Sequence, residues 1–163
     1  AGLPVPSMRH WDRSVPALLR AGNDGVPEIR GQGYAVRRYN GCLYRVPDRA
    51  PVPQGILELT PGAEVAWGDF RLRVTGAGQA TPASFRITPR QGGERIRERQ
   101  QGPSRPLKKW LQDKDVPPWD RTRLPLVWHE DQLIAVGDLW LAAGYTGATP
   151  TSGWRVVCER DFN

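Results

Sequence analysis

The stretch GPSRPLKKWLQDKDVPPWDRTRLPL, residues 102–126, contains the clearest amphipathic pattern in this chain. Leu107, Trp110 and Leu111 recur at i, i+3 and i+4, which is the spacing of an apolar stripe on a helix. The same stretch holds six cations: Arg105, Lys108, Lys109, Lys114, Arg121 and Arg123. The pattern therefore predicts a short helix with a core side and a cationic side.

Local signals predict where this helix begins and ends. Ser104 is a candidate N-cap, and Arg105 and Pro106 suit a first helical turn. The run Val116-Pro117-Pro118 should end the helix, because proline lacks an N–H and its ring clashes with the preceding turn. The face opposite the apolar stripe is expected to carry Arg105, Lys108, Lys109 and Gln112.

The formal net charge of +6 originates in one segment of the 163-residue chain. Residues 85–123 contain eleven Lys or Arg and five Asp or Glu, a surplus of six, and the other residues carry twelve of each sign. This asymmetry favours a localised anionic partner such as nucleic acid. A merely solvated surface, with some arginines packed over tryptophans, is the alternative. A membrane contact is disfavoured, because the large apolar residues of the cationic helix fall on its core side.

The composition predicts a globular cytoplasmic domain with many turns. The chain is 39% hydrophobic and 25% charged, with 18 Gly and 16 Pro. It has no apolar run near the roughly 18 to 20 residues that span a bilayer, and AGLPVPSMRHW at the start does not resemble a signal peptide. Cys42 and Cys158 are expected to be buried, reduced thiols. With His10 and His129 they show no metal-ligand spacing, so no metal site is predicted.

Residues 1–50 are expected to be part of a larger unit. Residues 6–22 favour a helix with Ser7 as N-cap and an interruption at Pro16. Asn40-Gly41, between two β-rich runs, is the strongest two-residue signal for a hairpin. One helix and one hairpin bury too little apolar surface to be stable alone. The Pro-rich segment 47–55 predicts a boundary, with a second domain over residues 51–163.

The second domain is predicted to be a compact α+β unit with mainly antiparallel strands and one prominent basic helix. Leu72 and Val74 alternate with arginines, as expected for a strand with one solvent-exposed face. Phe85 and Ile87 likewise alternate with polar residues. Two further strands flank a polar turn at residues 129–131, and GWRVVCERDF predicts a last strand.

No catalytic constellation is found. The cluster His129, Glu130, Asp131 and Asp138 is the only one resembling acid–base machinery, and turn carboxylates are usually just solvated. Gly76-Ala77-Gly78 lacks the context of a dinucleotide fingerprint, and no Walker-type phosphate loop occurs. The sequence thus predicts a binding module without catalytic residues, in preference to a self-contained enzyme that uses these acids.

The order FRITPRQGGERIR (85–97), GPSRPLKKWLQDKDVPPWDRTRLPLVW (102–128) and DQLIAVGDLWLA (131–142) resembles the C-terminal region of bacterial tRNA(Ile)-lysidine synthases. AGLPVPS (1–7) and VRRYNGCLYRVP (36–47) resemble the end of that family's central substrate-binding domain. The resemblance implies a β-sandwich-like α+β fold for residues 51–163, of the kind also found in the phenylalanyl-tRNA synthetase β chain.

The resemblance also implies an activity for a longer parent protein. Such enzymes use ATP with magnesium to adenylate C2 of cytidine 34 in an isoleucine tRNA with a CAU anticodon, and lysine then displaces AMP. The catalytic PP-loop motif SGG-x-DS is absent here, so this chain is expected to be an inactive fragment without a cofactor of its own. Its expected partners are the acceptor-stem end of the tRNA and its own N-terminal catalytic domain; homodimer formation is left open.

An acceptor stem is an A-form helix, which proteins read through phosphates and 2′-hydroxyls. The residues expected to contact it are Arg90, Arg95, Arg97, Arg105, Lys108, Lys109, Arg121, Arg123 and Trp119. Trp119 either stacks on a base or packs between its proline neighbours. Gly92 and Gly93 are expected mainly to form a turn, and the GPSR turn to offer a helix N-terminus to an anion. The alternative is a protein-interaction domain that docks on an acidic partner surface.

Overall fold

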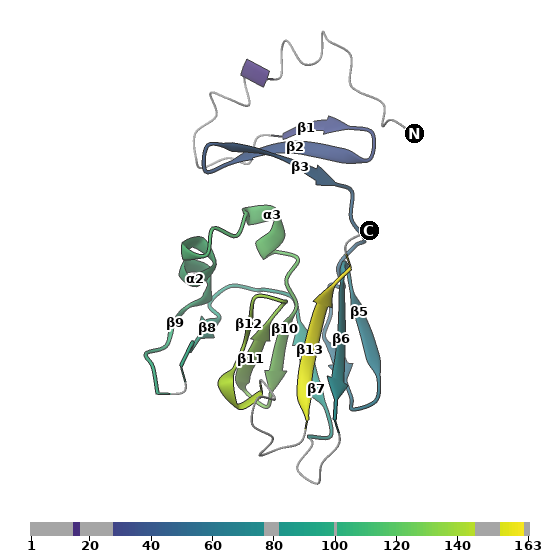
Figure 1. Cartoon of the computed structure of the whole chain (residues 1–163), viewed down its shortest axis with the longest axis vertical. Coiled ribbons are helices and arrows are strands. Elements are labelled where there is room, and N and C mark those ends of the chain that lie inside the picture. Colours follow the sequence, from purple (N-terminus) through teal and green to yellow (C-terminus); the bar gives the residue numbers. More distant parts are fainter. Residues whose placement is uncertain (1–14, 17–27, 77–81, 100, 146–153, 162–163) are drawn as a thin grey trace. The chain divides into compact units, whose positions relative to one another are not determined.

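The computed structural model describes residues 15–16, 28–76, 82–99, 101–145 and 154–161. The chain divides into two compact units, Ala1–Arg49 and Ala50–Asn163, which are drawn in Figure 1. No helix within the described residues is long and apolar enough to cross a membrane.

The first unit contains an antiparallel sheet of order β1-β2-β3, formed by β1 (Glu28–Gly31), β2 (Tyr34–Tyr39) and β3 (Cys42–Pro47). The predicted hairpin is confirmed: Asn40 and Gly41 connect β2 to β3 with φ values of 47° and 77°. β1 was not predicted, because its four residues are too few to show a period. The helix expected over residues 6–22 lies outside the described residues except for Val15 and Pro16, which are helical.

The second unit is an α+β domain built on two antiparallel sheets, as predicted. The five-stranded sheet has the order β12-β11-β10-β7-β4 and the three-stranded sheet the order β13-β6-β5. Their strands are β4 (Leu57–Leu59), β5 (Glu64–Trp67), β6 (Phe70–Thr75), β7 (Phe85–Thr88), β10 (Leu126–His129), β11 (Gln132–Val136), β12 (Trp140–Leu141) and β13 (Arg155–Arg160). Of these, β12 was not predicted, because a strand of two residues is too short to show an alternation of apolar and polar side chains.

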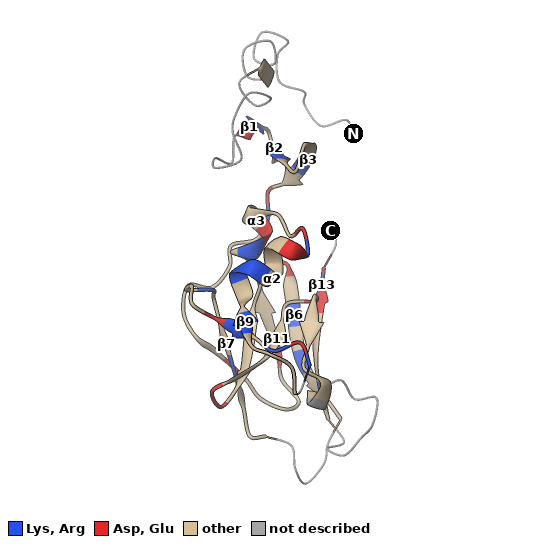
Figure 2. Cartoon of the chain, turned by 90° about the vertical axis from the view of Figure 1, so that its left-hand side faces the viewer, with Lys and Arg blue, Asp and Glu red and all other residues tan. Residues whose placement is uncertain are grey.

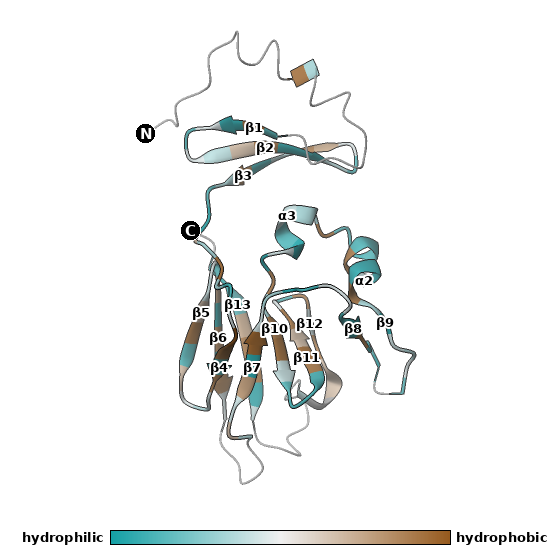
Figure 3. Ribbon diagram, turned by 180° about the vertical axis from the view of Figure 1, so that it is seen from behind, coloured by the Kyte–Doolittle hydropathy of each residue, from teal (hydrophilic) through white to brown (hydrophobic). Residues whose placement is uncertain are grey.

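The two sheets share one hydrophobic core. Leu72 of β6 and Ile87 of β7 are fully buried, whereas their neighbours Arg71 and Arg86 are exposed, so the predicted alternation is confirmed. The hydropathy colours of Figure 3 show brown segments along the sheet strands and a mostly teal α2. Burial of these alternating side chains is what holds the sheets face to face.

A small module of β8 (Arg95–Ile96), β9 (Arg105–Pro106) and α2 (Leu107–Asp113) packs on this core. Leu107, Trp110 and Leu111 are at most 1% exposed, which confirms the predicted core side of the helix. We call residues 95–113 the β8–β9–α2 module. It is followed by α3 (Pro118–Arg121), and later by the short 3-10 helix η1 (Ala143–Tyr145).

The predicted start of the helix was wrong. Ser104 does not cap α2; the N-cap residue is Pro106, without a side-chain hydrogen bond. Arg105 and Pro106 pair with β8 instead of forming a helical turn, and the Leu107 N–H donates to the Glu94 carbonyl at 2.8 Å. This cross-strand pairing delays the helix by two residues, since the backbone of 105–106 is already used in a ladder.

The end of the helix follows the prediction, but the Pro-Pro pair also begins a new element. α2 ends at Asp113, before Val116 and the two prolines. Pro118 then occupies the first turn of α3, where its missing N–H costs nothing and its fixed φ suits a helix.

The two cysteines differ from the prediction in part. Both thiols are free, and Cys158 on β13 is half-buried, but Cys42 on β3 is exposed. Cys42 immediately follows the hairpin turn, and the next three residues of β3 are exposed as well. Its apolar neighbours in sequence therefore do not indicate a buried position.

Candidate nucleic-acid interface

In the β8–β9–α2 module, a buried residue of β8 lies between two exposed cations. Ile96 is 1% exposed and anchors β8, while Arg95 and Arg97 on either side of it are exposed. Successive residues of an extended chain point to opposite sides, so these two arginines project away from the core. Arg99 is exposed too, as is Glu98 before it, so the alternation ends at Arg97.

Arg95 is held in place without losing its charge. Its Nε donates to the hydroxyl of Ser104 at 3.0 Å and its Nη2 donates to the Ser104 carbonyl at 2.6 Å. Both acceptors are neutral, and no carboxylate of the described residues forms an ion pair with Arg95, so the guanidinium keeps its positive charge. Ser104 thus orients a cation across the hairpin, a role different from the predicted helix cap.

The exposed side of α2 carries two adjacent lysines. Lys108 and Lys109 are exposed, and within the described part of the chain neither forms an ion pair. In Figure 2, part of the α2 ribbon is blue, and so is part of β9. Arg105, which was predicted to belong to the same free face, instead donates to Asp113 at 3.0 Å. Lys114 lies over the ring of Trp110, 5.8 Å from its centroid.

Three of the predicted contacts have structural partners inside the domain. Arg123 donates from Nε and Nη2 to Oδ2 of Asp69, at 3.3 and 3.1 Å, and from Nη2 to the Ala50 carbonyl at 2.6 Å.

The side chain of Arg90 is only 14% exposed and lies 3.7 Å from Glu94. The Nε of Arg121 donates to the Val116 carbonyl at 2.6 Å.

Gly92 and Gly93 form a turn, as expected, and two N–H groups at this turn are already bonded. The backbone N–H groups of Gln91 and Gly92 both donate to Oε1 of Glu94, at 2.5 and 2.8 Å. With φ values of 96° and 84°, Gly92 and Gly93 form a left-handed turn around a carboxylate of the same chain. The N–H of Leu107 at the start of α2 is likewise bonded, to the Glu94 carbonyl, so this donor is not available to an anion.

Trp119, the aromatic residue predicted at the interface, is buried with 9% exposure. It lies in α3 between Pro118 and Asp120. This burial favours packing, the second of the two readings of Trp119, because a stacking base needs an open ring face.

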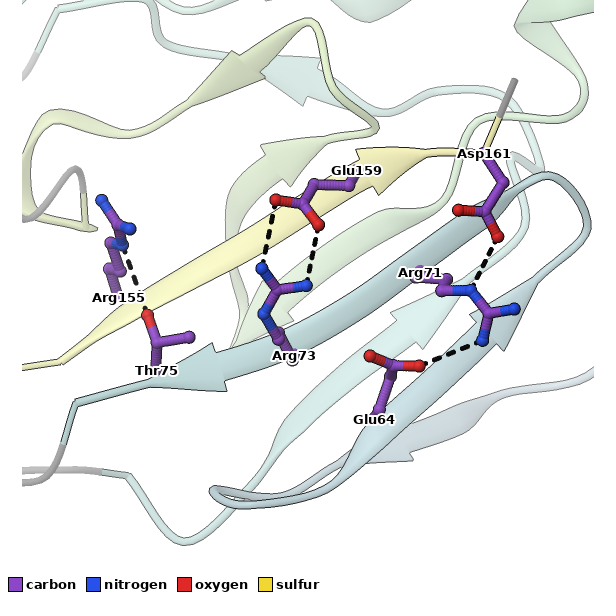
Figure 4. A network of polar contacts seen from close by, with 7 residues as sticks. All are labelled: Glu64, Arg71, Arg73, Thr75, Arg155, Glu159 and Asp161. Atoms are coloured by element: carbon purple, nitrogen blue, oxygen red, sulfur yellow. Dashed lines mark hydrogen bonds and ion pairs between the residues drawn. The ribbon is translucent and has the colours of Figure 1, made fainter. Parts of the chain in front are cut away.

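A second group of arginines lies on the exposed face of the three-stranded sheet but is neutralised there. Arg73 donates from Nη1 and Nη2 to the two carboxylate oxygens of Glu159, at 2.8 and 3.1 Å. Arg71 donates to Asp161 at 2.7 Å and to Glu64 at 3.0 Å. Figure 4 shows these pairs running across β13, β6 and β5, and we call them the ion-pair ladder. Their charges compensate one another locally, so this face offers little to a polyanion.

The ladder shifts the pKa of its members in the direction expected for paired charges. The hydrogen bonds that Arg71 donates to Asp161 and Glu64, together with the charges of these carboxylates, raise the pKa of Arg71. Hydrogen bonding to Arg73, together with its charge, lowers the pKa of Glu159. Both shifts favour the ionised forms of Arg71 and Glu159.

A groove of about 960 Å³ runs beside the β8–β9 hairpin. Its described lining includes two cations of the module, Arg95 and Arg97, and four aromatic residues of the five-stranded sheet side, Trp128, Trp140, Tyr145 and Trp154. It also includes four carboxylates: Glu94, Glu98, Glu130 and Asp131. The volume lies within the range of small-molecule sites, roughly 300 to 1,000 Å³.

The aromatic side of the groove is a cluster of rings that contact one another. The hydroxyl of Tyr145 lies 2.8 Å from Nδ1 of His129, and the Tyr145 ring contacts Trp154 with centroids 5.4 Å apart. Burial, and secondarily the charge of Glu130, raises the pKa of Tyr145. His129 is thus a half-buried member of an aromatic cluster, whereas Glu130 and Asp131 are exposed, as predicted for turn acids.

Of the nine predicted contacts, four are exposed residues of this module: Arg95, Arg97, Lys108 and Lys109. Arg105 lies in the same module but is ion-paired, and the remaining four lie partly or fully buried. Arg99, which is also exposed, was not singled out. The aromatic groove was missed because its rings come from segments far apart in sequence.

Family models and curated relatives both match this chain to one family of proteins. Residues 85–158 match the model of the TilS substrate C-terminal domain, and residues 1–44 match that of the TilS substrate binding domain. The tRNA(Ile)-lysidine synthase of Alkalilimnicola ehrlichii is 30% identical over 98% of this chain and 37% of the relative. Those of Serratia proteamaculans (31%) and Ralstonia nicotianae (33%) align over 95% and 96% of this chain. The chain spans about 37% of the length of each of these curated relatives.

Proposed function

Because this chain belongs to the tRNA(Ile)-lysidine synthase family, we propose that its β8–β9–α2 module binds the acceptor-stem end of isoleucine tRNA with a CAU anticodon. In this proposal residues 1–50 belong to the central substrate-binding domain and residues 51–163 form the tRNA-binding C-terminal domain. The parent enzyme joins lysine to C2 of cytidine 34, and its catalytic PP-loop domain supplies the ATP and magnesium chemistry. This chain contributes binding and orientation only.

The observation that carries the proposal is the exposed lysine pair of α2. Lys108 and Lys109 project from a helix whose other side is fixed by the buried Leu107, Trp110 and Leu111. The lysines therefore sit on a rigid support, and no described acidic residue pairs with them. Fixed cations without carboxylate partners are what a phosphate backbone requires.

The module extends this positive surface onto the hairpin. Arg95, oriented by Ser104, and Arg97 add two guanidinium groups that can each hydrogen-bond phosphate oxygens. A double-stranded RNA helix offers phosphates and 2′-hydroxyls at regular intervals, and its deep major groove hides most base edges. The expected mode of recognition is therefore by shape and charge. Binding energy gained here, far from cytidine 34, serves to position the substrate.

The test is a salt-titrated binding measurement with this chain and isoleucine tRNA. We compare the wild type with Lys108→Gln and Lys109→Gln, and with Arg155→Gln as a matched control. Arg155 is an exposed cation on β13, outside the module, whose Nε donates only to Thr75 among the described contacts. Each lysine that contacts a phosphate contributes about 0.7 to 0.9 to the slope of log K against log salt concentration.

The expected result is a shallower slope for each lysine variant and an unchanged slope for Arg155→Gln. An equal reduction by all three variants would indicate diffuse attraction and contradict the assignment to the module. If the chain bound no tRNA but bound its own catalytic domain through the same lysines, the protein-docking alternative would replace the proposal.

A further inference from the structure

The groove beside the β8–β9 hairpin has a chemistry unlike that of the lysine face. Its described lining has four carboxylates against two guanidinium groups. Two of the carboxylates are already hydrogen-bonded, Glu94 to backbone N–H groups and Glu98 to the indole N–H of Trp110. A phosphate entering it would meet more negative than positive charge. The groove is therefore unsuited to an RNA backbone, although it lies next to the surface proposed to bind one.

The aromatic lining suits a flat, uncharged ring. Trp128 and Trp140 are half-buried, so each keeps part of its surface open to the groove. The indole N–H of Trp128 donates to Thr88 at 2.9 Å, and Arg86 lies 5.8 Å from the ring centroid, so the orientation of this ring is fixed. Any nucleobase has a π face that stacks on such side chains.

The carboxylates match the polar edge of a base. Glu130 and Asp131, exposed in the β10–β11 turn, line the same groove. A carboxylate accepts hydrogen bonds from exocyclic amino groups, as glutamate and aspartate do with the N4 amino group of cytosine. Such edges are available only when the base is unpaired, because pairing consumes them in double-stranded RNA.

We propose that this groove holds an unpaired nucleobase of the single-stranded 3′ end that continues the acceptor stem. The inference rests on the proposed function, since it takes the stem to lie on the β8–β9–α2 module. Arg97 belongs both to that module and to the lining of the groove. A strand leaving the stem along Arg97 would keep its phosphates near the guanidinium while one base turns inward onto the rings.

A cationic side chain of another protein is the other occupant that rings and carboxylates could accept. The described lining holds more carboxylates than guanidinium groups, so its charge does not disfavour a cation. The base is favoured because Arg97 belongs both to the groove and to the module proposed to bind the stem, which would place an RNA strand beside the groove.

The test compares two isoleucine tRNA transcripts, one complete and one lacking its unpaired 3′-terminal nucleotides. Stacking of one base on an aromatic side chain predicts about five- to 100-fold weaker binding of the shortened transcript to the wild-type chain. Trp140→Ala should bind both transcripts equally, and Trp140→Phe should restore part of the difference. Leu139→Ala is the matched control, because Leu139 is an exposed neighbour that does not line the groove.

The outcomes separate the two proposals. Equal binding of both transcripts by the wild type would overturn the groove assignment, even if Lys108→Gln still reduced the salt slope and so supported the proposed function. Absence of tRNA binding would overturn both. If Trp140→Ala fails to fold, the comparison of the two transcripts with the wild-type chain still tests the groove assignment. Tryptophan fluorescence of the wild type gives a second readout: only the complete transcript should quench it.

Discussion

Arg123 and Asp69 form the ion pair that ties the start of β10 to the turn between β5 and β6. The guanidinium donates through two nitrogens to one carboxylate oxygen, and both side chains are less than 20% exposed. The carbonyl of Arg123 also accepts from the indole N–H of Trp67 at 3.0 Å. Arg123 therefore connects the two sheets, whereas the charge pattern alone placed it among the RNA contacts.

We expect Arg123→Ala to lower the free energy of unfolding by about 1 to 3 kcal/mol, because it leaves Asp69 partly buried without its charged donor. Urea unfolding of the wild type and the variant measures this difference. Lys109→Ala is the control and should change stability by less than about 0.5 kcal/mol. An Arg123→Ala variant of unchanged stability but reduced tRNA salt slope would contradict the structural role.

Trp110→Ala should cost about 3 to 5 kcal/mol, because the side chain is fully buried and its removal leaves a cavity beneath α2. Its indole N–H also donates to Oε1 of Glu98, which connects the helix to the end of β8. Thermal unfolding followed by far-ultraviolet circular dichroism measures the loss. Trp110→Phe keeps most of the buried surface and should recover more than half of it; equal effects of the two variants would argue against a packing anchor.

The ion-pair ladder predicts a defined dependence of stability on pH. Hydrogen bonding to Arg73 holds the pKa of Glu159 below its ordinary value of 4.5. The pair therefore stabilises the folded state fully above the unfolded pKa, and this contribution is lost as pH falls through the lower folded pKa.

Glu159→Gln should flatten the acid side of the stability curve, as measured by urea unfolding midpoints between about pH 5 and pH 3. High salt should have a similar effect on the wild type, because the pairs are exposed and screened. Wild type and Glu159→Gln curves that fall in parallel over this range would show that other carboxylates govern acid unfolding.

The two thiols should react at very different rates. Burial, with a smaller contribution from Asp138, raises the pKa of Cys158 to about 12, so almost no thiolate exists near neutral pH. Cys42 is exposed. Iodoacetamide at about pH 8 should therefore modify Cys42 and leave Cys158 unmodified in the folded chain, as peptide mass spectrometry would show. Cys42→Ser should abolish labelling until urea is added; rapid labelling of Cys158 in that variant would contradict its burial.

The sequence was most informative where a pattern repeats or a turn has strict requirements. The Asn40-Gly41 hairpin, the alternating strands around Leu72 and Ile87, and the core stripe of α2 were all predictable for this reason. Two-residue strands such as β8, β9 and β12 have no period to detect. The N-cap prediction at Ser104 failed because a long-range backbone pairing with β8 outweighed a local preference.

The candidate site was predictable only as a region. Sequence counts showed that cations outnumber acids between residues 85 and 123, but the partner of Arg123 lies 54 residues away. Only the fold reveals which cations meet a carboxylate and which do not. For the same reason the aromatic groove, assembled from β10, β12, η1 and Trp154, had no signature in the order of the residues.

The ion-pair ladder has one more consequence for how a large anion meets this domain. Because the ion pairs compensate the charges of the three-stranded sheet, we expect the positive field of the domain to be strongest at the β8–β9–α2 module. A polyanion drifting within a Debye length, about 8 Å at physiological salt, experiences a torque as well as an attraction. The β8–β9–α2 module would thus face the polyanion before the first contact is made.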